Sequence, residues 1–277
     1  MRWHFTLMAI LVALGAWEWS PSRPGEVGRT AFLGRTDERR SAAAAQADPR
    51  VAEFAEAVAE LRSVPPEDPS ARAALEKALK LLDGIATTAL GAGSGNASEA
   101  ANQVLARFVT REPPVGESYR VYRVGEEPDV YALGVNFGSG GPSAVRLYAR
   151  SNPRGPYQLA GQIDRFVQKD YFDDYLELAV VDRKSAVFVT VTGRTDELQS
   201  GSFALWKYDG KAVSALWSSD LLPHSSYEAV PRGLMVTYCA DLDEENPKVC
   251  RKTVRDTYQW DGNAWTRVSQ QEFSPRP

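Results

Sequence analysis

Histidine is nearly absent from this chain of 277 residues. Of its two histidines, His4 lies in an apolar N-terminal segment, so only His224 remains for the rest of the chain. Zinc sites commonly use several imidazoles, and a serine triad needs one imidazole beside its nucleophile. A site with several histidine ligands is therefore excluded, and no Gly-x-Ser-x-Gly motif supplies a nucleophile for His224. His224 follows Pro223 and is expected to lie in a turn.

The chain also has no excess of basic residues. Its formal net charge is −4, with a pI near 5.4, whereas nucleic-acid-binding proteins hold phosphates on a basic surface. Nucleic acid is therefore not expected as a partner. Neither glycine-rich stretch, 91–95 or 138–141, has the strand-then-helix context of a nucleotide site, so no cofactor is expected.

Cysteine is scarce as well, with only Cys239 and Cys250. One ends a predicted strand and the other begins the next, which places the two thiols across a hairpin. In an oxidising compartment such a pair forms a disulfide when the geometry allows. We predict a structural Cys239–Cys250 bridge rather than a redox site, because no closely spaced Cys-x-x-Cys pair is present.

Long apolar runs are missing apart from one at the N-terminus. The run from Phe5 to Trp17 follows a basic residue and is shorter than the ~20 residues of a membrane-spanning helix. Residues 1–19 are predicted to be a signal peptide or an N-terminal membrane anchor, and 20–48 a flexible linker without apolar period. The protein is then periplasmic, secreted or membrane-anchored, and touches the membrane only through this segment.

A helical region of three helices is predicted over 49–112. Asp48-Pro49 and Asp68-Pro69 each combine an N-cap residue with proline at the first helical position. Asn96 followed by Glu99 is a capping pattern for the third helix. Apolar residues then recur at helical spacing, which indicates helices that pack on one another or on the following domain.

After Pro113-Pro114 the apolar period changes from helical to alternating, which predicts a repeated antiparallel β domain over 115–273. Twelve strand patterns fall into three sets of four, separated by turn residues. They cover 119–124, 130–137, 144–149 and 157–163, then 175–181, 186–192, 203–208 and 212–217, then 227–230, 234–239, 249–260 and 265–268.

Two of these sets share one corner, Tyr208-Asp209-Gly210 and Trp260-Asp261-Gly262, with a degenerate version at 152–155 in the first set. The corners lie about 50 residues apart, and four strands at this period resemble the blades of a β-propeller. The predicted fold is mainly β with an N-terminal helical region and repeated four-stranded antiparallel units, propeller-like, with a sandwich or barrel as alternatives. A ring completed by a second copy, and thus a homo-oligomer, is a further alternative.

One acidic cluster alternates with aromatic residues. It contains Asp170, Asp173 and Asp174, together with Tyr171 and Tyr175. Carboxylates beside aromatic faces are typical of sites that bind or hydrolyse sugars. The competing interpretation is a solvated loop between two sheets.

A second acidic cluster places Asp241, Asp243 and Glu245 at alternate positions, as calcium loops do. Asn246 stands where such a loop needs glycine, and Lys252 where it needs a bidentate glutamate. An acidic hairpin tip is the expected structure.

Aromatic residues of the β domain form a third group of candidates, either for core packing or for a recognition surface. They are Trp206, Trp217, Trp260, Trp265, Tyr148, Tyr157, Tyr208 and Tyr258.

No residue is assigned a catalytic, cofactor or metal role. The sequence favours an exported, non-enzymatic β module of the cell envelope that binds a protein, peptide or glycan or acts as an assembly component. The alternatives are a secreted polysaccharide hydrolase that uses Asp173 and Asp174, and a calcium-dependent adhesion-like module that uses 241–246.

Overall fold

The computed structural model describes residues 49–65, 68–93, 96–109, 117–127, 129–138, 141–164, 174–195 and 197–273. The predicted signal peptide or anchor (1–19) and linker (20–48) lie outside these residues. All described residues belong to the same compact unit of the chain.

Among the residues that the structure describes, three helices precede the strands: α2 (Pro49–Ser63), α3 (Pro69–Ala92) and α4 (Ala97–Leu105), the last extended by a 3₁₀ turn, η1 (Ala106–Phe108). The Asp68 carboxylate caps α3 by accepting a hydrogen bond from Ser70 N at 2.8 Å. Asn96 caps α4 by accepting from Glu99 N, and its amide donates to the Glu99 side chain. Within the described part of the chain, no helix combines the length and apolarity that crossing a bilayer requires.

The rest of the described chain forms three four-stranded antiparallel sheets, each with its strands in chain order. The structure thus confirms the mainly β fold with an N-terminal helical region, and none of the three sheets closes into a barrel. The first sheet contains β1 (Ser118–Glu126), β2 (Asp129–Asn136), β3 (Ser143–Ala149) and β4 (Gln158–Asp164). The second contains β5 (Tyr175–Asp182), β6 (Val187–Gly193), β7 (Gly201–Tyr208) and β8 (Val213–Ser218). The third contains β9 (Ser226–Val230), β10 (Gly233–Leu242), β11 (Cys250–Trp260) and β12 (Trp265–Phe273).

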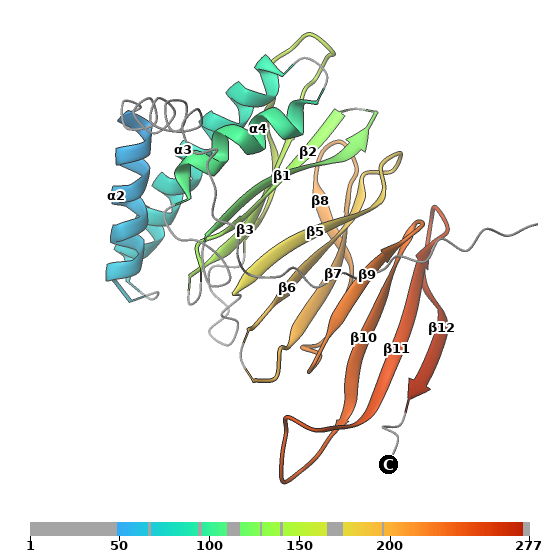
Figure 1. The fold of residues 1–277 in the computed structure, drawn as a ribbon. Coiled ribbons are helices and arrows are strands. Elements are labelled where there is room, and N and C mark those ends of the chain that lie inside the picture. Colours follow the sequence, from blue (N-terminus) through green and yellow to red (C-terminus); the bar gives the residue numbers. More distant parts are fainter. Residues whose placement is uncertain are drawn as a thin grey trace, which may run out of the picture. The chain divides into compact units, whose positions relative to one another are not determined.

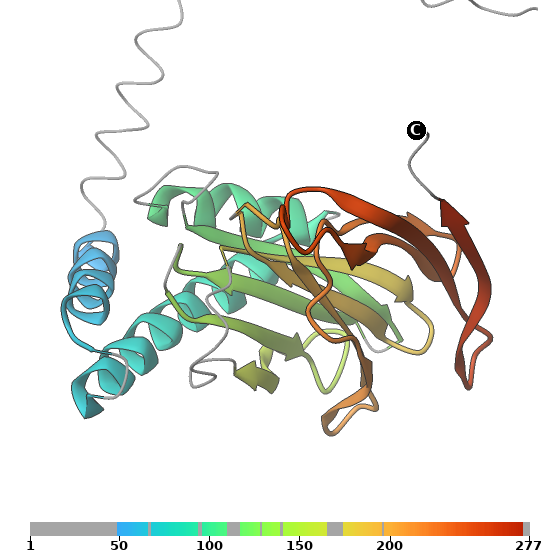
Figure 2. The ribbon, with the colours of Figure 1, turned by 90° about the horizontal axis from the view of Figure 1, so that it is seen from below.

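Three apolar cores join these layers in chain order, helices first and third sheet last (Figures 1 and 2). Alternation along β2 sends Leu133 toward the helices and Ala132 toward the second sheet. Val189 of β6 and Leu234 of β10 then belong to the core between the second and third sheets. The inner strands of the first and second sheets are therefore covered on both faces, which explains why β6 is buried along its whole length.

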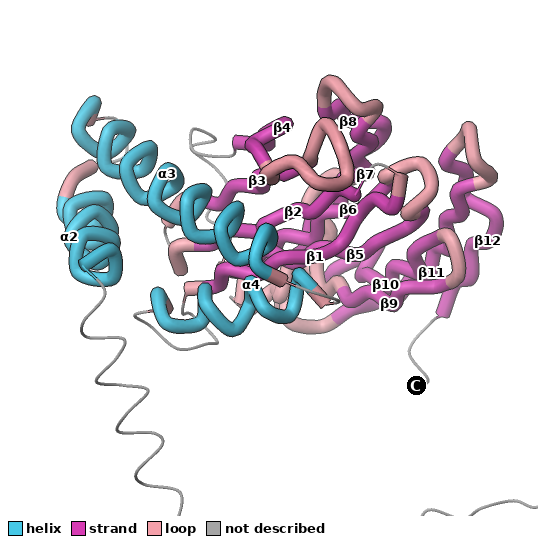
Figure 3. Tube along the Cα trace, turned by 90° about the horizontal axis from the view of Figure 1, so that it is seen from above, coloured by secondary structure: helices cyan, strands magenta, loops and turns pink. Residues whose placement is uncertain are grey.

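Helix α4 covers the free edge of β1. The Asn102 amide donates to Val121 O at 3.0 Å, and its oxygen accepts from Val121 N at 2.6 Å. One side chain thus completes the backbone hydrogen bonds of an edge strand and blocks pairing with another strand there. Figure 3 shows α3 and α4 on the side of the first sheet away from β5–β8.

The repeat predicted from the two corners is present in the backbone. Asp209 accepts from Lys211 N and Ala212 N, and Asp261 accepts from Asn263 N and Ala264 N, at 2.7 to 2.9 Å. These backbone hydrogen bonds lower the pKa of both carboxyl groups. The following Gly210 and Gly262 have φ of 92° and 111°, a conformation that favours glycine.

The last strand of every sheet also carries a one-residue bulge at a corresponding place. The unpaired residues are Ala160 in β4, Leu216 in β8 and Val268 in β12. A bulge at an edge strand twists the edge and discourages pairing with other chains. The three sheets therefore repeat one four-stranded antiparallel arrangement.

The predicted disulfide is present between Cys239 and Cys250, with Cα atoms 5.7 Å apart. It links Cys239, three residues before the end of β10, to the first residue of β11, near the base of their hairpin. Closing a loop of this size stabilises the fold by about 3 kcal/mol on the chain-entropy account. The bond is compatible with an extracytoplasmic location.

Candidate functional site

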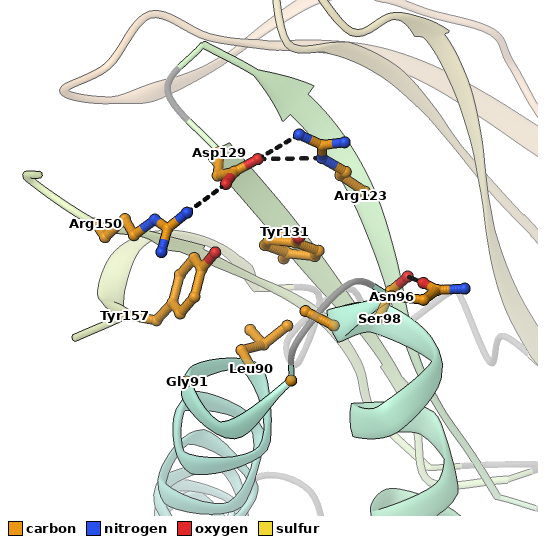
Figure 4. Close-up of a pocket in the computed structure, with 11 residues that line it drawn as sticks. Leu90, Gly91, Asn96, Ser98, Arg123, Asp129, Tyr131, Arg150 and Tyr157 are labelled. Atoms are coloured by element: carbon orange, nitrogen blue, oxygen red, sulfur yellow. Dashed lines mark hydrogen bonds and ion pairs between the residues drawn. The ribbon is translucent and has the colours of Figure 1, made fainter. Parts of the chain in front are cut away.

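A pocket of about 260 Å³ lies where the end of α3 and the start of α4 meet the first sheet (Figure 4). Its walls come from both helices, from β1 and β2, and from the segment between β3 and β4. The lining residues are Leu90, Gly91, Gly93, Asn96, Ala97, Ser98, Arg123, Asp129, Tyr131, Arg150 and Tyr157.

Strand alternation brings the polar residues of the sheet to this pocket. Asp129 and Tyr131 lie two positions apart on β2 and share its helix-facing side, since Tyr131 belongs to the core beneath the helices. Arg123 stands opposite Tyr131 on β1. Arg150 follows the end of β3, whose Ala149 pairs with Val130. The register of three strands therefore gathers two guanidinium groups around one carboxylate.

Asp129 bridges the two arginines. Its Oδ1 accepts from Arg123 Nε at 3.1 Å and from Arg123 Nη2, and its Oδ2 accepts from Arg150 Nη2 at 2.7 Å. The hydrogen bonds to Asp129 raise the pKa of Arg123 above its ordinary value. A guanidinium carries five N–H donors. Asp129 therefore fixes both guanidinium groups while it accepts hydrogen bonds from only some of their N–H donors.

Two buried tyrosines form the floor of the pocket. The rings of Tyr131 and Tyr157 meet edge to face, with centroids 5.4 Å apart. The Arg150 guanidinium lies 5.0 Å from the centroid of the Tyr157 ring, a distance at which a cation is attracted to the ring face. Burial raises the pKa of Tyr157 to about 12. Its hydroxyl is therefore protonated at neutral pH and can donate a hydrogen bond.

Helix ends complete the wall. The side chain of Asn96 is occupied by Glu99, whereas the N–H groups of Ala97 and Ser98 belong to a first helical turn, which has no intrahelical acceptors. The positive end of α4 is offset by the negative end of α3, which contributes Leu90 and Gly91. The net charge at the pocket is therefore set by its side chains.

The pocket is suited to recognition. Asp129 is the only carboxylate among the lining residues, and two arginines hold it. Acid–base hydrolysis of a glycoside needs two carboxyl groups that face one bond. Nowhere in the described residues do three or more histidine, cysteine, aspartate or glutamate side chains gather in a way that could hold a metal ion.

The acidic cluster between the first two sheets is described only from residue 174 onward, so Asp170, Tyr171 and Asp173 lie outside the described residues. Asp174 Oδ2 accepts from Thr195 N at 2.7 Å and from Thr195 Oγ1 at 2.8 Å. Tyr175 is half-buried against the core between the second and third sheets. Asp174 thus holds the segment after β6 beside the start of β5.

The second acidic cluster lies at the hairpin between β10 and β11. Asp243 accepts from Glu245 N at 2.9 Å, from Asn246 N at 2.8 Å and from Arg251 Nη2 at 2.8 Å. Chiefly the bond from Asn246 N lowers the pKa of this carboxyl group. Asp241 and Glu245 are exposed. Asp243 therefore closes the tip of the hairpin.

The aromatic candidates divide by location. Tyr148, Tyr208 and Trp260 are buried, and Trp206 donates its indole N–H to Thr190. Trp217, Tyr258 and Trp265 pack on one another where the second and third sheets meet, with centroids 4.9 to 6.1 Å apart. Within this group, only Tyr157 lines the pocket.

Sequence reasoning singled out Tyr157 and missed Arg123, Asp129, Tyr131 and Arg150. One signal was available, since opposite charges flank the predicted turn between the first two strands and favour a cross-strand ion pair. No protein-family model, curated protein or solved structure matches this chain.

Proposed function

We propose that this protein is an exported, non-enzymatic binding module of the cell envelope, and that its pocket between α3, α4 and the first sheet binds a small ligand or the end of a peptide or glycan. One observation carries the proposal. Two guanidinium groups with unused donors, fixed by Asp129, face an open volume walled by Tyr131 and Tyr157. Concave sites with a few converging polar groups on an aromatic wall are typical of ligand recognition.

Export is supported by two independent features. The N-terminal apolar run has the length of a signal-peptide core, and the Cys239–Cys250 disulfide is stable in an oxidising compartment. The linker over 20–48 would let the folded unit stand away from a membrane or be released with a loose tail.

We also propose that the three sheets are an open, propeller-like array that is complete in a single chain. The helices cover the first sheet, and the outer face of the third sheet is mainly polar, with Val230, Met235 and Phe273 among its apolar residues. Alternation with the buried positions places Thr237, Thr253, Arg255, Thr257 and Gln271 on that outer face. A terminal repeat needs a polar outer face to end a stack without a partner.

Sedimentation equilibrium of the full chain in density-matched detergent is therefore expected to give the mass of one chain, 30.5 kDa. Replacement of Arg255 by glutamate at the centre of the polar face should leave that mass unchanged, because no second copy covers it. A stable dimer that Arg255→Glu dissociates would show instead that the third sheet is an interface.

The pocket itself is tested by filling it. A Cβ added at Gly91 meets no heavy atom within 4 Å, so Gly91→Phe places a ring at the pocket wall without a backbone clash (Figure 4). A compound that binds the native state raises its midpoint of thermal unfolding. We expect compounds found in a thermal-shift screen of amino acids, short peptides, sugars and sugar acids to bind Gly91→Phe at least about tenfold more weakly by calorimetry, a loss of roughly 1.4 kcal/mol.

Gly84→Phe is the matched control. Gly84 lies on the same helix, is exposed, and likewise has no heavy atom within 4 Å of an added Cβ, but does not line the pocket. Both substitutions remove a helical glycine and add the same ring. Equal loss of binding in the two variants, or binding unchanged in Gly91→Phe, would rule out this pocket as the site.

A further inference from the structure

We infer that the group bound in the pocket is a monovalent carboxylate, held by Arg150 and Arg123. This inference rests on the proposed function, because it names the chemistry of the ligand in the same pocket. It separates the pocket from sites for neutral sugars, amines and phosphate groups.

The charged side chains that line the pocket indicate the charge of the ligand. Arg123 and Arg150 are the cations and Asp129 the only anion among the lining residues, which leaves one positive charge. The positive end of α4 and the negative end of α3 both reach the pocket and largely cancel. Glu126 acts on Arg123 from outside the lining. One unbalanced guanidinium neutralises the single negative charge of a carboxylate. A phosphate dianion would leave one negative charge without a partner.

The hydrogen-bond geometry of the two arginines indicates which group the pocket binds. Arg123 gives two donors to Asp129 Oδ1, while Arg150 donates to that carboxylate through Nη2. The side chain of Arg150 is 27% exposed, so its planar fork is held by Asp129 and Tyr157 and still reaches the open volume. A planar fork matches the two oxygens of a carboxylate. A neutral carbonyl or hydroxyl offers a single uncharged acceptor oxygen, so its hydrogen bonds to this fork would be weaker than those of a carboxylate.

The size and walls of the pocket indicate the size and character of the rest of the ligand. A volume of about 260 Å³ suits a small acid or the terminal residue of a chain. Leu90, Ala97 and the rings of Tyr131 and Tyr157 offer apolar contact beside the charged group (Figure 4). The same chemistry is found in the free carboxylate of an amino acid and in that of a sugar acid.

The test compares acids with their neutral counterparts on the unaltered full chain. Calorimetry measures N-acetylphenylalanine against N-acetylphenylalanine amide, and glucuronic acid against glucose. We expect at least one acid to bind, and its neutral partner to bind about tenfold or more weakly, because charge-assisted hydrogen bonds are lost. The first pair reports an amino-acid source of the carboxylate and the second a sugar-acid source. If neither acid binds, or if a neutral partner binds equally well, the inference is overturned.

Substitutions of Arg150 then test whether this arginine binds the carboxylate of the ligand. Arg150→Gln is expected to weaken binding of the acid about tenfold or more, and Arg150→Lys by less, since lysine keeps the charge without the fork. Arg154→Gln, in the same connecting segment but outside the lining, should bind like the unaltered protein. Circular dichroism checks that each variant is folded, and the ligand pairs need no variant. If Gly91→Phe abolishes binding of an amide or glucose that binds as tightly as its acid, the proposed function stands and the carboxylate inference fails.

Discussion

Replacement of Asp83 by alanine is expected to lower the free energy of unfolding by about 3–5 kcal/mol, the usual cost of removing one partner of a buried ion pair. Asp83 lies within α3 and accepts from Arg146 Nε at 3.0 Å, from Arg146 Nη2 and from Tyr148 Oη at 2.7 Å. The two charged side chains are only 18% and 11% exposed. Without Asp83, a guanidinium and a phenol would stay buried with fewer acceptors.

Urea unfolding of the full chain measures this effect. Tyr148→Phe removes a single hydrogen bond and is expected to cost only about 1 kcal/mol. Asp83→Leu combined with Arg146→Met should recover most of the loss, because an apolar pair replaces a buried ion pair at little cost. If Asp83→Ala unfolds within about 1 kcal/mol of the unaltered protein, the ion pair does not hold α3 on the first sheet.

The Tyr148 hydroxyl remains a donor in this group over the ordinary pH range. Burial, followed by the charge of Asp83, raises the pKa of Tyr148 above its usual value. An ionised phenol beside a carboxylate would be repelled, so the raised pKa keeps the hydroxyl protonated and its bond to Asp83 intact. The connection between α3 and β3 also places the end of α3, with Leu90 and Gly91, at the pocket.

Most strands could be predicted because consecutive strands pair through short turns. The corners at Asp209 and Asp261 can be recognised from the sequence because they are local structures. In each, an aspartate accepts hydrogen bonds from two backbone N–H groups and precedes a glycine at positive φ. The last strand was predicted to end at Val268 and continues to Phe273. Its residues after Val268 are exposed, so no buried face produced an alternating pattern there.

The order in which the layers stack was harder to predict from the sequence than the positions of the strands. A buried strand such as β6 is apolar on both faces or carries small polar residues, so periodicity does not say which neighbour covers which face. Thr190 and Thr192 of β6 are both fully covered, although threonine is also common on exposed faces. The stacking of sheet on sheet emerges only from contacts between residues far apart in the chain.

Apart from Tyr157 and the opposite charges that flank the first predicted turn, nothing in the sequence indicates the pocket, because its residues carry no motif. Arg123, Asp129 and Arg150 occupy ordinary positions at the ends of three strands, and their common function depends on strand register and on where α3 stops. Gly91 is informative only once its surroundings are known. The acidic clusters looked more like sites, yet Asp174 and Asp243 are engaged by nearby backbone N–H groups.

Replacement of Phe54 by alanine is the second change with a large expected effect, about 3–5 kcal/mol for a fully buried phenylalanine. Phe54 of α2 is 0% exposed. Its ring meets Phe108 and Tyr119 edge to face at 5.7 and 5.4 Å and stacks near Phe137 at 6.5 Å. No other residue of α2 makes ring contacts of this kind, so the cavity would lie between α2 and the first sheet.

Phe273→Ala is the matched control, because it deletes the same ring at a site that is 42% exposed. Phe273 contacts Arg255, whose guanidinium lies 5.2 Å from the ring centroid, and its loss is expected to cost no more than about 1 kcal/mol. Urea unfolding compares the two variants, and hydrogen exchange shows where the loss falls. Amides of α2 should lose protection in Phe54→Ala before those of α3, since Asp83 fastens α3 to the sheet independently. Equal costs for the two substitutions would show that α2 is not held by this aromatic group, and loss of protection in α3 together with α2 would show that the helices detach from the first sheet as one body.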